Sequence, residues 1–258
     1  MITEVKGLVI RTTDIRESDR LLTIFTEEIG VLSALAQGAR SLKSRKMSST
    51  MQFCYSRFFL YKKGEHYYVK EAELIESFFE LRNSIEGLAL AAYIADVLSD
   101  VTVASEEREL LRLSLNSLYA IANKKYSLEK IKAVFEIRTA SILGFMPDVL
   151  SCSACGEKNG NFYFDIMGGS IKCYECNERE SRSHQEPESP HESHIVRILS
   201  EGAKTALGYC IYAPVEKVFS FNISDEDMKL FTKAAEDYLL NQLERSFKTL
   251  EFYKEVTE

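Results

Sequence analysis

Up to about residue 78, hydrophobic and polar positions form short segments that have the pattern of β-strands. Branched and aromatic residues dominate each segment, and turn signals such as Lys63-Gly64-Glu65 separate most of them. Five strands are predicted, over Ile2 to Arg11, Leu21 to Thr26, Val31 to Ala36, Phe53 to Tyr61 and Tyr67 to Ile75. Five antiparallel strands in about 75 residues suit a small closed barrel of the oligonucleotide-binding kind, because closure removes exposed strand edges.

From Ser84 the hydrophobic period changes to that of helices, which marks a domain boundary near residue 80. Serines followed by acidic residues predict helix N-caps at Ser105, Ser127 and Ser224. The helix after Ser127 should end near Gly144, because Pro147 cannot continue it. Helical periodicity returns from His194, and the helix after Ser224 is expected to be the last.

The chain has 258 residues, of which 45% are apolar, so a globular protein is expected rather than a disordered one. Its longest uncharged apolar run is about half the roughly 20 residues that cross a bilayer, and the N-terminus lacks an apolar signal-peptide core. We therefore expect a soluble protein of the cytoplasm with no membrane partner.

Four of the six cysteines form two pairs, Cys152-Ser153-Ala154-Cys155 and Cys173-Tyr174-Glu175-Cys176. Two residues lie inside each pair and 17 between the pairs, which is the spacing of a zinc ribbon or knuckle. Gly156, Gly168 and Gly169 supply the tight turns of such a knuckle. Four thiolates complete a tetrahedron around one Zn²⁺ and leave no position for water, so the ion is expected to be structural.

Iron–sulfur ligation, disulfides and free thiols are the alternatives for these four cysteines. His184, His191 and His194 follow the pairs, but four thiolates already saturate one ion, so we interpret these histidines as solvated side chains. His66 is expected to be a surface or half-buried residue. Cys54 and Cys210 are isolated and are expected to be small buried apolar residues.

These observations predict an α+β protein. Residues 1–80 would form a five-stranded OB-fold barrel, and residues 81–258 an all-helical domain. The helical domain would contain a zinc-binding insertion over residues 150–178 and a polar surface loop over residues 177–193, which has five glutamates and no large apolar residue.

The charge of the chain is unevenly distributed. The net charge is −7, yet residues 38–70 contain eight basic residues and one acid, so this segment carries +7 and the remainder −14. Cations neutralise phosphates, and aromatic faces stack on unpaired bases. The candidate DNA contacts are Arg40, Lys43, Arg45 and Lys46 in a loop after the third strand, with Arg57, Lys62 and Lys63 in the fourth strand and its turn.

Six aromatic residues accompany these cations and are candidates for base stacking: Tyr55, Phe58, Phe59, Tyr61, Tyr67 and Tyr68. Neighbouring residues of a strand point to opposite faces, so about half of these rings can face a groove while the rest fill the barrel. Core packing is therefore the competing interpretation for each aromatic residue, and an ordinary solvated side chain is the competing interpretation for each lysine.

Several segments of the chain resemble bacterial RecO proteins. A five-strand domain comes first, and it is followed by a helical region that two cysteine pairs interrupt. The resemblance also includes the run Gly38-Ala39-Arg40-Ser41-Leu42-Lys43-Ser44-Arg45. Ala213-Pro214-Val215-Glu216-Lys217-Val218-Phe219-Ser220-Phe221 and Arg245-Ser246-Phe247-Lys248-Thr249-Leu250 add to the resemblance, which extends from Gly7 to Phe252.

The resemblance implies a non-enzymatic recombination mediator in DNA repair. Such proteins bind single-stranded DNA and act with RecR to load RecA onto strands coated by the single-stranded-DNA-binding protein. They also anneal complementary strands without ATP. The same resemblance implies that Cys152, Cys155, Cys173 and Cys176 hold the metal. Some members of the family lack these cysteines, so zinc would brace the helical domain here rather than serve the shared mechanism.

Two other functional classes remain open. The first is a zinc-ribbon adaptor that binds only protein, which predicts no salt-sensitive affinity for DNA. The second is a metal-dependent nuclease that holds magnesium through Asp14, Glu17 and Asp19, although loosely spaced acids near Arg16 and Arg20 are usually a solvated turn. Against an enzyme, the sequence has no phosphate-cradling glycine loop and no nucleophile elbow.

Overall fold

The computed structural model describes residues 2–101, 107–183 and 195–258. The chain divides into two compact units, one of Met1–Lys125 with Phe247–Glu258 and one of Tyr126–Ser246. The first unit contains more than the expected barrel domain, because two helices after the barrel and the C-terminal helix belong to it. None of the helices within the described ranges is both long and apolar enough to span a membrane.

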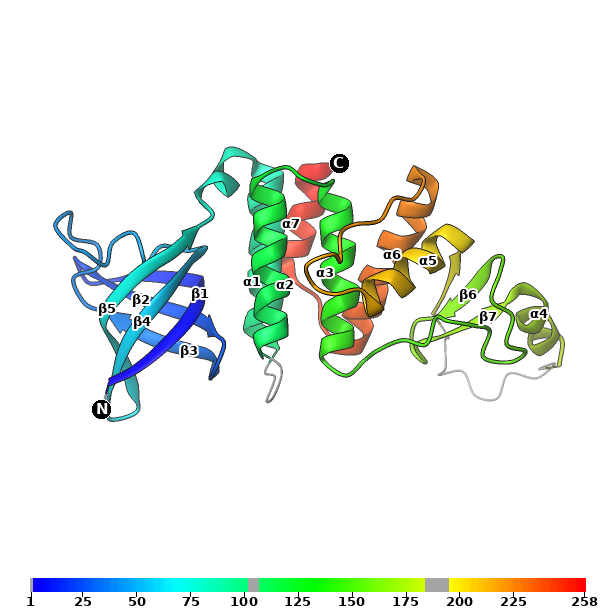
Figure 1. The fold of residues 1–258 in the computed structure, drawn as a ribbon, viewed down its shortest axis with the longest axis horizontal. Helices are drawn as coiled ribbons and strands as arrows, with labels where there is room; N and C mark the ends of the chain where they lie inside the picture. The colour runs from blue at the N-terminus through cyan, green and yellow to red at the C-terminus, as the bar shows by residue number, and fades with distance from the viewer. Residues whose placement is uncertain (1, 102–106, 184–194) are drawn as a thin grey trace. The chain divides into compact units, whose positions relative to one another are not determined.

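Five strands form a closed barrel in the first unit, with the order β1-β2-β3-β5-β4 (Figure 1). Their bounds are β1 Ile2–Ile15, β2 Asp19–Thr26, β3 Gly30–Ala36, β4 Cys54–Lys63 and β5 His66–Ser77. Along β4, burial alternates with the pleat, so that Ser56, Phe58 and Leu60 are buried while Arg57 and Phe59 are half-buried. The barrel and its five strands were therefore correctly predicted, each strand being longer than or shifted slightly from its expected range.

The barrel closes through a short parallel contact between β3 and β5, at Ala34 with Tyr67 and Leu35 with Tyr68. Beyond this contact, the loop of residues 37–53 runs beside β5. The Lys46 ammonium donates a hydrogen bond to the carbonyl of Val69 at 3.3 Å, and the Ser49 hydroxyl donates one to the carbonyl of Ala72 at 3.2 Å. The loop thus supplies partners to β5 carbonyls that β3 is too short to reach.

Three α-helices complete the first unit: α1 Ile85–Asp100, α2 Glu107–Ala122 and α7 Lys248–Thr257. A short 3₁₀ helix, η1 Phe79–Asn83, precedes α1. Helices α1 and α7 pack together, with the rings of Tyr93 and Phe247 edge to face at 5.7 Å between centroids. The predicted N-cap at Ser105 lies outside the described residues. Helix α7 follows the helix that was expected to be the last, so that expectation was wrong.

The second unit combines helices with a small sheet. Its helices are α3 Leu128–Ile142, α4 Tyr174–Ser183, α5 Glu201–Tyr212 and α6 Asp225–Leu243, and its strands are β6 Phe162–Asp165, β7 Ser170–Cys173 and β8 Val196–Leu199 in the order β7-β6-β8. Ser127 and Ser224 are N-caps, as predicted, each accepting a hydrogen bond from the backbone N–H three residues later. Gly144 follows the end of α3 with a φ of +93°, which is unfavourable for a residue with a side chain.

Two predictions for this region were wrong. Residues 177–183 belong to α4 rather than to the expected polar loop of residues 177–193, of which 184–193 lie outside the described residues. An ion pair between Glu178 and Arg182, 3.5 Å apart, lies along this polar helix. Downstream, β8 precedes α5, so the helix expected from His194 begins only at Glu201.

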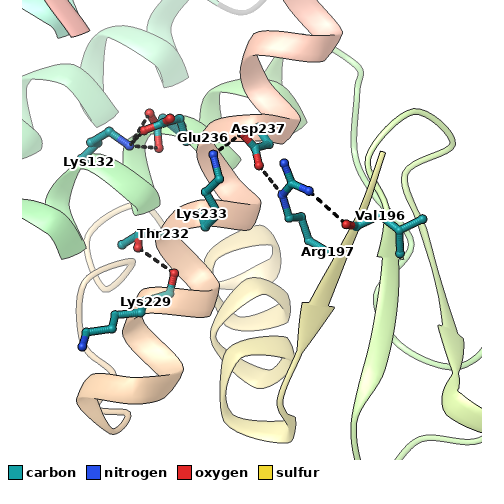
Figure 2. A network of polar contacts seen from close by, with 9 residues as sticks. Lys132, Val196, Arg197, Lys229, Thr232, Lys233, Glu236 and Asp237 are labelled. Carbon is teal, nitrogen blue, oxygen red and sulfur yellow. Dashed lines mark hydrogen bonds and ion pairs between the residues drawn. The ribbon is translucent and has the colours of Figure 1, made fainter. Parts of the chain in front are cut away.

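A buried ionic cluster joins α3 to α6 (Figure 2). The Lys132 ammonium lies 3.0 Å from the Glu136 carboxylate and 2.7 Å from the Glu236 carboxylate, and all three side chains are nearly inaccessible to solvent. Burial is the largest single effect and would lower the pKa of Lys132, but the carboxylates of Glu136 and Glu236 together outweigh it and raise the pKa above its ordinary value. On the next residue of α6, Asp237 pairs with Arg197 of β8 and with Lys233. Helix α6 therefore connects α3 to the small sheet.

Replacing Lys132 by methionine keeps most of the side-chain volume and removes the charge. Two buried carboxylates would then lack their cation, so we expect the free energy of unfolding to fall by about 3–5 kcal/mol. Lys233→Met is the matched control, because Lys233 is exposed and its ion pair with Asp237 is worth about 0.5 kcal/mol. Urea denaturation followed by circular dichroism measures both values, and equal small losses would contradict the importance of the buried cluster.

Candidate metal centre and nucleic-acid interface

The four paired cysteines converge on one point. Their sulfur atoms all lie within 4.8 Å of one another, and the Sγ atoms of Cys155 and Cys173 are 3.7 Å apart. Four sulfurs bound to one ion at about 2.3 Å lie about 3.8 Å from each other, so these separations fit a tetrahedral thiolate site. The predicted convergence of the four cysteines is thereby confirmed, in a cluster consistent with a structural metal site.

Local backbone geometry places each cysteine. Cys152 and Cys155 flank a tight turn in which the N–H of Gly156 donates to the carbonyl of Cys152 at 2.9 Å, and Gly156 has a φ of +80°. Cys173 is the last residue of β7, and Cys176 lies in the first turn of α4. The N–H of Cys173 donates to the sulfur of Cys152 at 3.3 Å, which ties the two pairs together.

The thiols of the cluster differ in acidity. Burial alone would raise the pKa of Cys152, but hydrogen bonds from the backbone N–H groups of Cys173, Cys155 and Ala154 lower it to about 6. Hydrogen bonds with the neighbouring thiols, first that of Cys173, raise the pKa of Cys176 to about 12. Deprotonating all four thiols would place four negative charges close together. A divalent cation bound between the sulfurs would offset the repulsion among these charges.

The other cysteines and histidines either are not members of this cluster or lie outside the described residues. Cys54 and Cys210 are buried, as predicted, and burial raises the pKa of both thiols. His66 is exposed at the start of β5, also as predicted. The segment that contains His184, His191 and His194 lies outside the described residues.

Three of the seven candidate DNA contacts are held by other groups of the barrel. The guanidinium of Arg40 lies 3.2 Å from the carboxylate of Asp14, and Lys46 binds the carbonyl of Val69. Burial lowers the pKa of Lys46. Arg57 lies between two acids of neighbouring strands, 3.3 Å from Glu4 and 3.7 Å from Glu73. The positive charge of the sequence segment is thus partly neutralised by residues from outside it.

The other four candidates are exposed. Lys43 and Arg45 lie in the loop of residues 37–53, and neither makes an ion pair with the described part of the chain. Lys62 and Lys63 lie at the β4–β5 turn, where the Lys62 ammonium is 3.7 Å from Glu65 and 5.8 Å from the centre of the Tyr67 ring. These four cations are accessible to a phosphate backbone.

Four of the six candidate aromatic residues point out of the barrel wall. Tyr55, Phe59, Tyr61 and Tyr68 are half-buried. Phe58 is fully buried in the barrel core and unavailable for stacking, whereas Tyr67 is half-buried and packs against that core. The rings of Tyr61 and Tyr68 stack on each other, with centroids 5.3 Å apart and an interplanar angle of 17°.

The Tyr61–Tyr68 pair continues a row of outward residues across the sheet. In the strand register, Leu35 of β3 is paired with Leu21 of β2 on one side and with Tyr68 of β5 on the other. Tyr68 is in turn paired with Tyr61 of β4. Leu21 is 38% exposed. Sequence reasoning missed the two leucines, although the alternation of β2 and β3 already placed them opposite to the buried residues.

In the nuclease alternative, Asp14, Glu17 and Asp19 would hold magnesium together. The structure instead pairs Asp14 and Asp19 with arginines. Asp14 lies 3.0 Å from Arg20, and Asp19 lies 3.7 Å from Arg16 and accepts a hydrogen bond from the N–H of Gly38 at 2.8 Å. Within the described ranges, the side chains of His, Cys, Asp and Glu that gather closely enough to share one ion are those of the four cysteines. Asp14, Glu17 and Asp19 do not form such a group. The structure therefore gives no support to a carboxylate metal site there.

Comparison with known proteins agrees with this architecture. The model of the family "Recombination protein O N terminal" matches residues 1–78, and that of "Recombination protein O C terminal" matches residues 82–251. The chain is 34% identical over 253 residues to a DNA repair protein RecO of Acetivibrio thermocellus, which covers 97% of this chain and 96% of the relative.

Two further relatives carry the same description. A DNA repair protein RecO of Alkaliphilus metalliredigens is 27% identical over 259 residues, covering 99% of this chain and 100% of the relative. One of Clostridium kluyveri is 32% identical over 185 residues, covering 70% and 71%. Since both family models match and together cover nearly the whole chain, this protein belongs to the RecO family of DNA repair proteins.

Proposed function

We propose that this protein is a recombination mediator without catalytic activity, which binds single-stranded DNA on its barrel. The observation that carries the proposal is the stacked Tyr61–Tyr68 pair on the outer wall, in a barrel whose loop of residues 37–53 exposes Lys43 and Arg45. Unpaired bases stack on aromatic faces, and cations follow the phosphate backbone. In barrels of this kind, the outer face and the adjoining loops bind oligonucleotides.

The seven basic residues would have two different tasks. Lys43, Arg45, Lys62 and Lys63 are exposed and would contact phosphates directly. The other three are held within the protein, Arg40 by Asp14, Lys46 by Val69 and Arg57 by Glu4 with Glu73. While no nucleic acid is bound, they would fix the loop and the wall that carry the exposed cations.

The proposed mechanism is exchange rather than bond-making chemistry. The barrel would compete for the phosphates of a strand coated by the single-stranded-DNA-binding protein, while the protein engages that coating protein and RecR, so that RecA can load. Two complementary strands held by exposed cations would anneal without ATP, since neutralised phosphates repel each other less. We place this activity in the cytoplasm, at the nucleoid.

We further propose that the four cysteines hold one Zn²⁺ as a structural ion. The sulfur separations fit a tetrahedral site, and thiolates are the ligands that zinc prefers in closed structural centres. Cys173 and Cys176 would anchor β7 to α4, and Cys152 with Cys155 would fix the turn that precedes the sheet.

An adaptor that binds protein is the second candidate function, and one observation favours it. On the small sheet, Tyr163 stacks with Tyr174 at 6.0 Å between centroids, and Ile198 lies beside Tyr163 in register. Tyr174 and Ile198 are 58% and 56% exposed. Exposed tyrosine and aliphatic groups are common at protein interfaces. A protein with this function alone would bind no oligonucleotide at low salt.

The double variant Lys43→Gln, Arg45→Gln tests the DNA-binding site. Loss of two phosphate contacts should weaken binding of a fluorescent oligothymidine at least tenfold in dilute buffer. It should also reduce the magnitude of the slope of log K against log salt by about 1.4. Lys217→Gln, Lys229→Gln is the control, because it removes the same charge from exposed positions of the second unit. Equal effects of the two double variants would contradict the site.

Stacking predicts a different signature for Tyr68→Ala. Removing one face of the tyrosine pair should weaken oligonucleotide binding by about 1–3 kcal/mol. The salt slope should remain unchanged, because no charge is lost. Tyr212→Ala serves as the control, since Tyr212 is an exposed tyrosine of the second unit. Fluorescence anisotropy at several salt concentrations separates the two effects, and unaltered affinity in Tyr68→Ala would argue against stacking.

The metal proposal predicts one zinc per chain by elemental analysis. Cys152→Ser should lose the metal and unfold at a lower temperature, because the ion contributes to folding free energy. Cys54→Ala is the control, since Cys54 belongs to the barrel and is not a member of the cluster, so this variant should retain full metal content. The proposal would be excluded if chelation removed all metal from the wild-type protein and its unfolding temperature stayed the same as before chelation.

A further inference from the structure

One carboxylate at the end of the barrel bridges two arginines. Oδ1 of Asp14 lies 3.0 Å from Nε of Arg20, and Oδ2 of the same residue lies 3.2 Å from Nε of Arg40. Asp14 and Arg20 are partners across the β1–β2 hairpin, whereas Arg40 comes from the loop of residues 37–53. Three separate segments thus converge on a single negative charge.

Both guanidinium groups are also held by backbone carbonyls. Nη1 of Arg20 donates to the carbonyl of Thr50 at 3.4 Å, and Nη1 of Arg40 lies 3.4 Å from the carbonyl of Arg16 and 3.3 Å from that of Glu17. The loop itself is pinned independently, since the Asp19 carboxylate accepts a hydrogen bond from Gly38. The two guanidinium groups therefore have positions that do not depend on Asp14 alone.

The bridge is accessible to solvent. The side chain of Asp14 is 48% exposed, that of Arg40 36%, and that of Arg20 16%. Two arginines around one oxyanion is an arrangement that also suits a phosphodiester, because guanidinium groups bind carboxylate and phosphate oxygens with similar geometry. An external phosphate could approach from the side on which Asp14 is exposed.

We propose that Arg20 and Arg40 form a phosphodiester site that the carboxylate of Asp14 fills while no nucleic acid is bound. The site rests on the proposed single-strand binding, which it refines. A phosphate of the strand displaces the carboxylate, so both arginines keep an anionic partner, and the 48% exposed side chain of Asp14 turns into solvent. Binding at this site is weakened by the cost of breaking two existing ion pairs, which favours transient contacts over permanent capture.

Asp14→Asn tests the proposal because it keeps the size of the side chain and removes the competing charge. Affinity for an oligothymidine in dilute buffer should rise roughly threefold to tenfold, the scale of two exposed ion pairs. Glu17→Gln removes the same charge from the turn of the same hairpin, at an exposed residue whose carboxylate does not contact these arginines, and should change affinity less than twofold.

The double variant Asp14→Asn, Arg40→Gln separates competition from general electrostatics. The gain of Asp14→Asn should disappear when Arg40 is absent. Equal gains in Asp14→Asn and Glu17→Gln, or a gain that persists without Arg40, would overturn the site while leaving single-strand binding intact. If wild type itself ignores the oligonucleotide, the proposed function fails instead.

A structural role for Asp14 gives a distinct result. Circular dichroism and thermal unfolding of Asp14→Asn would then show a less stable protein with reduced DNA affinity, which also overturns the proposal. Arg40→Lys in the otherwise unchanged chain is the second variant, and it keeps the charge but loses the planar fork. It should weaken oligonucleotide binding about threefold or more, and unaltered affinity there would count against the site.

Discussion

The barrel depends on how β5 is completed after its short parallel contact with β3. Only two residue pairs join these strands, so the barrel would expose unpaired backbone groups of β5 without another partner. The loop of residues 37–53 provides hydrogen bonds from Lys46 and Ser49 to that strand. Because barrel closure fixes this loop, the exposed Lys43 and Arg45 are presented from an ordered support rather than from a free chain.

The second unit meets a different constraint, since its small sheet has strands of only four residues. Such strands cannot be stable alone, and their support comes from both sides. Tyr238 of α6 packs against Phe164 of β6, and Asp237 pairs with Arg197 of β8. On the other side, the cysteine cluster links the end of β7 to α4. The cysteine cluster and helix α6 thus both support the small sheet.

Sequence patterns predicted the elements whose signals are local. Branched and aromatic residues between turn signals located the five barrel strands, serine caps located α3 and α6, and cysteine spacing located the four-cysteine cluster. The pattern failed where tertiary contacts decide. Strands β6 to β8 are too short to show a period, and α4 is polar throughout. Neutralisation of Arg57 by Glu4 and Glu73 required the strand register, because those acids lie outside the basic segment.

Amide hydrogen–deuterium exchange, with and without an oligothymidine in dilute buffer, tests the central claim most directly. Single-stranded DNA bound on the barrel should slow exchange in the loop of residues 37–53 and at the β4–β5 turn, with little change in α5 and α6. Slower exchange confined to residues 126–246, or none at the loop under conditions where the oligonucleotide is bound, would contradict the account.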